Sequence, residues 1–386
     1  MIEIKNKRDC CGCQACAIIC PRSCIYMMDD KEGFWYPEVD KDLCIECGLC
    51  EKVCPVINQG KLRSPLNVYA SINPDNEIRI KSSSGGIFTS IAQKIIVGGG
   101  VVFGACWNEN WLVHHTYIDN LNELEKFRGS KYIQSNLNKC FVDVRKFLKL
   151  DRKVLFSGTP CQIAGLKRYL GREYDNLLCV EVVCHGVPSP KVWMDYLKCL
   201  GRKNEDIANN KIVAISFRDK VTGWHKFSFS ISCSVNEHVK VVFKETFNKN
   251  SYMKGFLNNL YLRPSCHQCP ARSGKSGSDI AIADYWGVSN KNFQLDDDKG
   301  TSLVLIYTAK GQEIYDALNV KSYISSLEAA VRGNMCIANS VQEPIQRVLF
   351  WKEYEIKGVY VIEDICKKIS PSLFRRLMKK LKSFVR

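Results

Sequence analysis

The chain has 386 residues, of which 46% are hydrophobic and 25% are charged, a composition that is typical of folded proteins and excludes wholesale disorder. This length is enough for about two to three domains of ordinary size. Lysine and arginine outnumber aspartate and glutamate and give a formal net charge of +15, a surplus that can indicate binding to nucleic acid or to a membrane.

The cysteine content and the N-terminus bear on the cellular compartment. No uninterrupted run of about 18 apolar residues occurs, and residues 1–5 lack the apolar core of a signal peptide. The chain has 21 cysteines, and ten of them fall within the first 54 residues. Such clustering indicates metal ligation in a reducing compartment rather than disulfides, so we expect a cytoplasmic protein.

Two cysteine motifs of identical spacing lie near the start of the chain, 34 residues apart. Each reads Cys-x-x-Cys-x-x-Cys-x-x-x-Cys-Pro, once from Cys10 to Pro21 and once from Cys44 to Pro55. In bacterial ferredoxins the fourth cysteine of such a run binds the other cluster of the pair. We therefore predict two 4Fe-4S clusters, one held by Cys10, Cys13, Cys16 and Cys54 and the other by Cys44, Cys47, Cys50 and Cys20.

A pair of zinc sites is the alternative, because two Cys-x-x-Cys pairs can bind zinc. Zinc would leave the third cysteine and the Cys-Pro of each motif without a role, so the sequence favours clusters. Cys11 and Cys24 are left over and are expected to be small buried residues. If these two clusters and the third one predicted below are bound, twelve thiolates and three iron–sulfur cores would lower the net charge from +15 to about +9. Because the formal charge overstates the positive charge of the protein, we expect no nucleic-acid binding.

Residues 55–65 have the composition of a linker, which predicts a domain boundary near residue 62. Beyond it, apolar runs alternate with helical periodicity, a pattern that is typical of a mixed α/β domain. The expected strands cover residues 68–72, 101–105, 153–156 and 177–183, and the expected helices cover residues 87–96 and 163–170.

Two polar loops of this domain are candidates for a nucleotide site. Residues 82–86, Ser-Ser-Ser-Gly-Gly, precede a predicted helix whose free N–H groups would suit a pyrophosphate. The same loop is explained equally well as an ordinary N-cap. Residues 128–135 combine cationic, aromatic and hydrogen-bonding side chains, which could grip a flavin nucleotide or lie on an ordinary surface.

Two further strands end in turns that carry cysteines. Residues 157–162 read Ser-Gly-Thr-Pro-Cys-Gln, and residues 184–189 read Cys-His-Gly-Val-Pro-Ser. Such turns lie at the carboxyl edge of a sheet, where α/β proteins bind ligands. Together with a later Cys-x-x-Cys pair they supply the thiolates for a third cluster, at Cys161, Cys184, Cys266 and Cys269. A zinc site or a redox dithiol at the Cys-x-x-Cys pair is the alternative.

In this order, the motifs resemble those of the beta-subunit family of coenzyme F(420)-reducing hydrogenases and dehydrogenases. The resemblance covers roughly residues 1 to 350. It is carried by residues 83–86, 129–135, 158–162, 184–189 and 279–287, and by the Cys266-x-x-Cys269 pair.

The resemblance implies a bacterial dicluster ferredoxin fold followed by a mixed α/β domain that binds FAD, with the third cluster near the flavin. It also implies that the turn at residues 284–287, Asp-Tyr-Trp-Gly, closes over the site. The family's deazaflavin substrate is not carried over, because no motif here can be tied to it. Flavin contacts are expected from Ser83, Ser84, Gly85, Gly86, Lys131, Tyr132, Gln134, Ser135, Thr159 and Pro160.

These features predict an oxidoreductase that passes electrons from a ferredoxin-type donor protein through the clusters to FAD and on to a small organic substrate. The alternative is a non-catalytic electron-transfer subunit of a larger redox complex. No catalytic acid or base can be named. The expected regions are a ferredoxin-like domain over residues 1–61, a flavin-binding region over residues 62–150 and 151–350, and a tail over residues 351–386.

The tail contains a basic amphipathic segment after residues 370–372, Ser-Pro-Ser. Its apolar residues share one helical face, and lysines and arginines occupy the remainder. A helix of this kind can lie on an anionic membrane, so peripheral contact with the inner membrane face is one expectation. A terminal helix packed on its own domain is the other.

Overall fold

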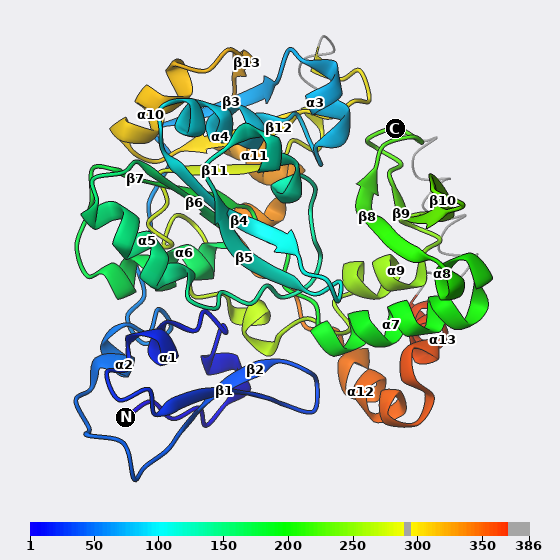
Figure 1. Cartoon of the computed structure of the whole chain (residues 1–386), viewed down its shortest axis with the longest axis horizontal. Helices are drawn as coiled ribbons and strands as arrows, with labels where there is room; N and C mark the ends of the chain where they lie inside the picture. Colours follow the sequence, from blue (N-terminus) through cyan, green and yellow to red (C-terminus); the bar gives the residue numbers. More distant parts are fainter. Residues whose placement is uncertain (289–294, 370–386) are drawn as a thin grey trace, which may run out of the picture.

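The computed structural model describes residues 1–288 and 295–369. The N-terminal domain is a small unit with a two-stranded antiparallel sheet, in which Ile25 pairs with Val39 (Figure 1). The elements of this domain are η1 (Lys7–Asp9), α1 (Ala15–Ile19), β1 (Ile25–Asp29), β2 (Trp35–Val39) and α2 (Leu49–Lys52).

The internal repeat of the sequence recurs in the backbone of the two cysteine loops. Gly12 and Glu46 are equivalent positions of the repeat, and both have positive φ angles, of 70° and 50°. Gln14 and Gly48, two residues further on, are also left-handed and precede helices α1 and α2. Backbone turns of this kind direct successive N–H groups toward one point, a geometry found at many iron–sulfur sites.

The central region is built on an eight-stranded mixed sheet in the order β13-β3-β12-β11-β7-β6-β4-β5. The four strands β4, β6, β7 and β11 are parallel to one another, so their carboxyl ends meet at one edge. The strands are β3 (Asn67–Ile72), β4 (Val101–Trp107), β5 (Val113–Ile118), β6 (Val154–Gly158), β7 (Leu177–Val182), β11 (Ile280–Asp284), β12 (Ser302–Ile306) and β13 (Lys321–Ile324).

Helices cover both faces of this sheet, as its alternating side chains require. They are α3 (Asn76–Lys81), α4 (Ile87–Val97), η2 (Leu121–Phe127), α5 (Cys140–Lys149), α6 (Pro160–Leu170), α10 (Ala309–Asp316) and α11 (Leu327–Gly333). Phe103 and Phe156 pack with α5 and α6, and Cys13 and Ala15 of the N-terminal domain join the same core. The adjacent residues of those strands pack with α4 on the other face. The N-terminal domain therefore rests on the α5 and α6 side of the sheet.

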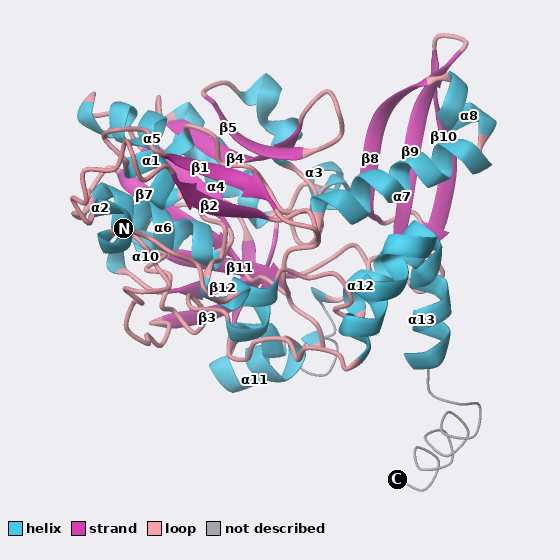
Figure 2. Cartoon of the chain, turned by 90° about the horizontal axis from the view of Figure 1, so that it is seen from below, coloured by secondary structure: helices cyan, strands magenta, loops and turns pink. Residues whose placement is uncertain are grey.

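A second sheet, which the sequence analysis did not predict, lies at the opposite end of the molecule from the N-terminal domain (Figure 2). Its three strands are antiparallel, in the order β10-β9-β8. The surrounding core is rich in aromatic side chains, among them Trp193, Phe217, Phe229 and Tyr252. The elements are α7 (Pro190–Lys203), α8 (Glu205–Asn209), β8 (Lys211–Asp219), β9 (Ser228–Val235), β10 (His238–Thr246), α9 (Ser251–Leu257), η3 (Pro264–Gln268), η6 (Met335–Ile337), α12 (Gln346–Lys357), η7 (Gly358–Tyr360) and α13 (Val361–Ile369).

The folded core extends beyond the boundary that we expected at residue 351. Helices α12 and α13 pack into the aromatic core, and Phe350, Ile362 and Ile365 are buried there. Residues 351–369 thus belong to the core, because α13 buries its apolar face against the domain. The predicted membrane-binding segment after residue 370 lies outside the described residues. Within residues 1–288 and 295–369, no helix combines the length and the apolar character that crossing a membrane requires.

Candidate redox site

The first predicted ligand set comes together where the two cysteine loops meet. Cys10, Cys13, Cys16 and Cys54 are all buried. Burial is the largest cause that raises the pKa of Cys16 to about 12, and the nearby thiols of Cys10 and Cys54 raise it further. Cys54 of the second motif therefore lies near Cys10 and Cys16 of the first motif, as the predicted exchange of the fourth cysteine requires.

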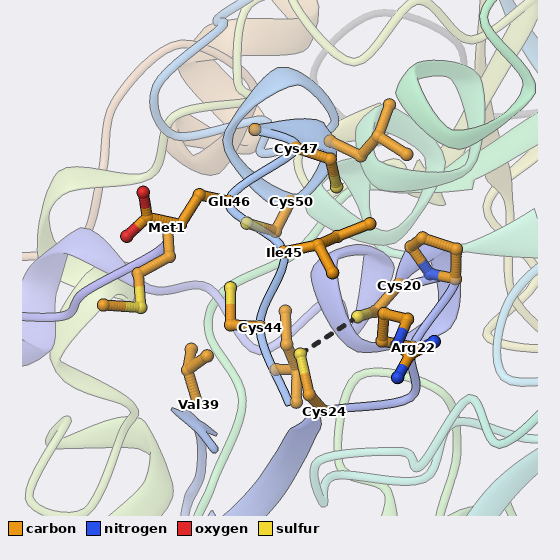
Figure 3. Close-up of a pocket in the computed structure, with 14 residues that line it drawn as sticks. Met1, Cys20, Arg22, Cys24, Val39, Cys44, Ile45, Glu46, Cys47 and Cys50 are labelled. Atoms are coloured by element: carbon orange, nitrogen blue, oxygen red, sulfur yellow. Dashed lines mark hydrogen bonds between the residues drawn. The ribbon is translucent and has the colours of Figure 1, made fainter. Parts of the chain in front are cut away.

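The second predicted set surrounds a pocket of the N-terminal domain. Cys20, Cys44, Cys47 and Cys50 line this pocket, and Figure 3 shows their sulfur atoms around a common space. Cys24, expected to be a spare buried thiol, also lines it, with its sulfur 3.4 Å from that of Cys20. Cys47 is exposed, so this set is the one that another protein can approach.

The third predicted set gathers at the carboxyl edge of the parallel strands. Burial is the main cause that raises the pKa of Cys184, and Cys266, Cys161 and Cys269 lie near enough for their charges to raise it further. The sulfur of Cys266 also accepts a hydrogen bond from the Val187 N–H at 3.4 Å. The structure therefore brings together four cysteines that are spread over more than 100 residues of sequence.

Two other cysteines lie beside the third set and were not predicted to do so. Cys11 of the N-terminal domain is next to Cys161, and Cys336 has its sulfur 3.8 Å from Nδ1 of His185. Among the described residues, no three His, Cys, Asp or Glu side chains lie close enough to hold a single metal ion. A cubane cluster spreads its four thiolates farther apart than one ion does, so this finding concerns single-ion sites.

A cavity of about 690 Å³ opens along the carboxyl edge of the parallel strands. Cys161 and Cys184 line it, and so do Asp284 and Trp286 of the turn that was expected to close over the site. Cys266 and Cys269 are not part of its lining. Most of the predicted flavin contacts surround the same cavity, namely Ser83, Ser84, Gly86, Lys131, Tyr132, Gln134, Ser135 and Thr159.

The two remaining predicted contacts, Gly85 and Pro160, do not line the cavity. A Cβ atom on Gly85 would lie 2.5 Å from the Ser71 carbonyl oxygen and 2.7 Å from the Ser302 nitrogen. Gly85 therefore allows the loop to lie directly against the backbones of β3 and β12. Pro160 is buried as the first residue of α6, a position at which its missing N–H breaks no helical hydrogen bond. Both residues serve the scaffold rather than the cavity.

The two loops that the sequence analysis singled out are hydrogen-bonded to each other. The Ser130 hydroxyl lies 2.9 Å from that of Ser83, and the Ser130 N–H donates to the same oxygen at 2.6 Å. Helix α4 begins after Gly86 without a side-chain cap, so its first N–H groups are available to an anion. In contrast, α6 is closed by its own capping box, in which the Thr159 N–H donates to Gln162 at 2.9 Å. Of these two helix starts, only that of α4 offers free donors to the cavity.

Lys131 contributes a positive charge to this side of the cavity. Its ammonium group donates to the carbonyl oxygens of Arg128 and Gly129, at 3.1 and 3.2 Å. Burial lowers the pKa of Lys131 to about 8, so that the side chain is mostly protonated at neutral pH. A phosphate group near the start of α4 would meet both the helix N–H groups and this cation.

Arg218, near the end of β8, is a cavity residue that the sequence analysis missed. Its guanidinium forms a bidentate ion pair with Asp284, with both N–O distances at 3.0 Å. It also donates to the Ser83 carbonyl at 3.3 Å and lies 3.9 Å from the ring centre of Phe227. The buried Arg218 side chain thus connects the three-stranded sheet with the turn at residues 284–287 and with the loop at residues 82–86. The arginine in an otherwise apolar strand was the only sequence signal for a buried ion pair. The sequence does not identify its partner, Asp284, because that residue is 66 positions away.

His115 is a second cavity residue without a sequence motif. Burial lowers the pKa of His115 to about 4, so its ring is neutral at physiological pH. Its Nε2 lies 3.1 Å from the Ser157 carbonyl and must carry the proton, and Nδ1 therefore accepts from the Ser135 hydroxyl at 2.7 Å. Because Ser135 donates to His115, its oxygen can act only as an acceptor toward the cavity.

The N-terminal domain forms part of the cavity wall. Cys11 and Gly12, which lie between two predicted ligands of the first cluster, line the cavity. Gly12 has a φ of 70°, and a Cβ atom there would lie 2.3 Å from Nε2 of Gln134. The same segment of chain thus contacts the predicted cluster site on one side and the cavity on the other.

These features define an iron–sulfur redox protein in which a ferredoxin-like domain is joined to an α/β domain with a large cavity. Residues 9–58 match the family model of the 4Fe-4S dicluster domain. Residues 151–330 match that of the C terminus of the beta subunit of coenzyme F420 hydrogenase/dehydrogenase. These matches confirm both the predicted dicluster domain and the resemblance to the beta subunits.

Curated relatives match parts of the chain. The F subunit of the F(420)H(2) dehydrogenase of Methanosarcina mazei is 25% identical over 213 residues, which are 51% of this chain and 60% of that relative. Ketoisovalerate oxidoreductase subunit VorC of Methanothermobacter marburgensis is 38% identical over 55 residues, 14% of this chain and 70% of that protein. A chain of the F420-reducing [NiFe] hydrogenase complex from Methanosarcina barkeri aligns with a TM-score of 0.46 at 18% identity, covering 78% of this chain and 93% of that one.

Proposed function

We propose that the protein is an iron–sulfur flavoprotein oxidoreductase. Electrons from a ferredoxin-type donor enter at the exposed Cys47 cluster, pass through the Cys10 cluster and the predicted third cluster, and reach FAD in the cavity, from which an organic substrate is reduced. The observation that carries this proposal is that one segment of chain contacts both sites. Cys11 and Gly12 lie between the predicted cluster ligands Cys10 and Cys13, and they also line the cavity. We keep the proposed division into a ferredoxin-like domain over residues 1–61 and a flavin-binding region over residues 62–350, and residues 351–369 complete the core of this second region.

The residues around the cavity suit a dinucleotide. Its volume of about 690 Å³ is within the range of small-molecule sites, about 300 to 1,000 Å³. The N–H groups at the start of α4, the hydroxyls of Ser83 and Ser84, and the Lys131 ammonium would hold the diphosphate, whereas Ser135 accepts a hydrogen bond from a ring N–H. When bound, FAD would supply the exchange between single electrons and electron pairs.

A third cluster is proposed at Cys161, Cys184, Cys266 and Cys269. Their proximity supports it, and Cys161 and Cys184 line the cavity, so a cluster there would lie against the flavin site. Cys11 lies next to Cys161, which places this set directly beside the N-terminal domain. The role of this cluster is to connect the Cys10 cluster with the cavity, and the protein adjusts its potential through burial and hydrogen bonds to sulfur.

A non-catalytic electron-transfer subunit is the second candidate. It is supported by the names of the relatives, which are subunits of oxidoreductases. Their partners and substrates are proposals for this chain, because the match to the dehydrogenase relative spans about three fifths of that protein. The cavity opens to solvent, which favours the enzyme, because a small substrate could reach a flavin bound there.

Anaerobic purification with quantification of iron, acid-labile sulfide and flavin tests the proposed function. We expect about twelve iron atoms and one FAD per chain. A content of about eight iron atoms per chain would show that only two clusters are bound and would refute the third cluster. A preparation with full iron and no capacity to bind added FAD would refute the flavoprotein function.

The affinity for FAD should decrease as the pH rises above 8. Lys131 must be protonated to attract a diphosphate, and its pKa is about 8 in the protein without ligand. The dissociation constant should therefore be flat below pH 8 and rise by up to about tenfold per pH unit above it. Fluorescence titration of flavin-depleted protein between pH 7 and 9.5 measures this.

The pH titration is repeated on one test variant, Lys131→Met, and on one control variant, Lys126→Met. Lys131→Met should bind FAD more weakly at pH 7 and lose the pH dependence. Lys126→Met removes a nearby lysine that is exposed and paired with Glu123, and it should behave like the wild type. A pH dependence that persists unchanged in Lys131→Met would contradict the assignment.

A further inference from the structure

Arg263 lies where the N-terminal domain meets the cavity wall, and it is fully buried. Its Nε donates to the Cys10 carbonyl at 2.8 Å, and its Nη2 lies 3.4 Å from the Cys10 sulfur. The same Nη2 donates to the Trp35 carbonyl at 2.9 Å. On the other side, Nη1 donates to Oε1 of Gln134, a cavity residue, at 3.2 Å. One guanidinium therefore bridges a predicted cluster ligand and the cavity.

The charge of Arg263 has no carboxylate partner in the described part of the chain. Arg347, which lies in the same interface, shows the usual arrangement, because it forms an ion pair with Glu32. Around Arg263 the polar contacts are carbonyl, amide and thiol groups, and the Tyr36 ring centre lies 4.3 Å from its Cζ. An aromatic face compensates a buried cation only in part, and a buried charge without a counter-charge is strongly unfavourable.

A cluster held by the first ligand set would supply this counter-charge. Four thiolates around a core of about +2 leave a net charge of about −2, which becomes more negative when the cluster is reduced. Cys10, one of these predicted ligands, is the residue whose sulfur and carbonyl both contact Arg263. Charges interact strongly in a buried, low-dielectric site, so a fixed cation here favours the reduced state.

We infer that Arg263 is a positioning residue that raises the reduction potential of the Cys10 cluster and holds this cluster against the cavity wall. In the step that it influences, one electron leaves the Cys47 cluster and enters the Cys10 cluster. No bond forms or breaks, and no proton has to move. The electron is then held beside the cavity. The inference rests on the proposed function, since it takes the cavity as the destination of the electron.

A potentiometric titration of the anaerobic holoprotein, followed by electron paramagnetic resonance, tests the inference. Arg263→Gln should lower the potential of one N-terminal cluster by at least about 59 mV, a tenfold change in the equilibrium of a one-electron couple. The other cluster serves as an internal reference. Arg263→Lys should give a smaller shift in the same direction, because an ammonium group keeps the charge but cannot contact Cys10 and Gln134 together.

Arg347→Gln is the matched control. It also removes a buried arginine from this interface, with its bonds to Glu32 at 2.9 Å and to the Leu262 carbonyl at 3.0 Å. Among the described residues, however, Arg347 forms no hydrogen bond with a cysteine. Both potentials should remain those of the wild type. Equal shifts in Arg347→Gln and Arg263→Gln, or unchanged potentials in Arg263→Gln, would overturn the inference. If Arg263→Gln does not retain iron, unchanged potentials in Arg263→Lys would overturn it.

Failure of this inference is distinguishable from failure of the proposed function. A wild-type protein with full iron but no bound FAD would refute the flavin-linked function, and the potentials of the arginine variants could still be compared. Bound FAD together with unaltered cluster potentials in the Arg263 variants would refute the role of Arg263 alone.

Discussion

Serine in place of Cys16 should abolish the reduction of bound FAD by an external one-electron donor. Cys16 is buried beside Cys10 and Cys54, and a cubane cluster needs all four of its thiolates. Loss of a residue that only supports metal ligands lowers affinity or activity about 10- to 100-fold, so loss of a ligand should slow flavin reduction by more than about 100-fold. The iron content should fall by about four atoms per chain.

Anaerobic iron analysis and the rate of flavin reduction by a reduced ferredoxin measure this effect. Cys24→Ser is the matched control, because Cys24 is also buried and its sulfur is 3.4 Å from that of Cys20. It should keep both the iron content and the rate of the wild type. Loss of four iron atoms from Cys24→Ser, with full iron in Cys16→Ser, would show that the ligands are assigned wrongly.

Alanine in place of Asp284 should lower the free energy of unfolding by about 3–5 kcal/mol, the usual result of removing one partner of a buried ion pair. Arg218 would lose both of its 3.0 Å contacts while only 6% exposed. The Trp224 indole N–H, which donates to Asp284 at 2.9 Å, would also lose its acceptor. Because this pair forms one wall of the cavity, FAD should be lost as well.

Asp119→Ala provides the comparison for Asp284→Ala. Asp119 pairs with Arg152 at 3.4 Å, and both side chains are partly or fully exposed to solvent. Its removal should cost less than about 1 kcal/mol and should leave the FAD content unchanged. Anaerobic thermal unfolding and flavin quantification of both variants measure the difference. Equal losses of stability in the two variants would contradict the buried role of the Arg218–Asp284 pair.

The parts of the site that were predictable lie in short stretches of sequence. The cysteine spacing identifies the dicluster domain, because the ligands of a cubane are fixed by a local loop geometry. The loops at residues 82–86 and 128–135 were recognised by their composition, and most of their predicted contacts line the cavity. The strand-ending turns of Cys161 and Cys184 follow from the rule that parallel strands present their carboxyl ends at one edge.

The parts that were missed depend on contacts between distant residues. Arg218 lies in a three-stranded sheet that carries no sequence motif. Its role depends on the ion pair with Asp284, which the fold brings close to it. Arg263 follows no recognisable signal and contacts Cys10 across 253 residues. Residues 351–369 were predicted as part of the tail although their apolar side chains complete the core, because the sequence of an amphipathic helix does not show which surface it packs against.

Rapid mixing of the anaerobic oxidised holoprotein with a reduced ferredoxin tests most directly whether electrons pass from the N-terminal clusters to a flavin in the cavity. Absorbance of the clusters and of the flavin is followed at separate wavelengths. We predict that the cluster absorbance decreases first and then recovers as the flavin absorbance decreases. Reduction of the flavin before the clusters, or clusters that stay reduced while the flavin stays oxidised, would contradict this route.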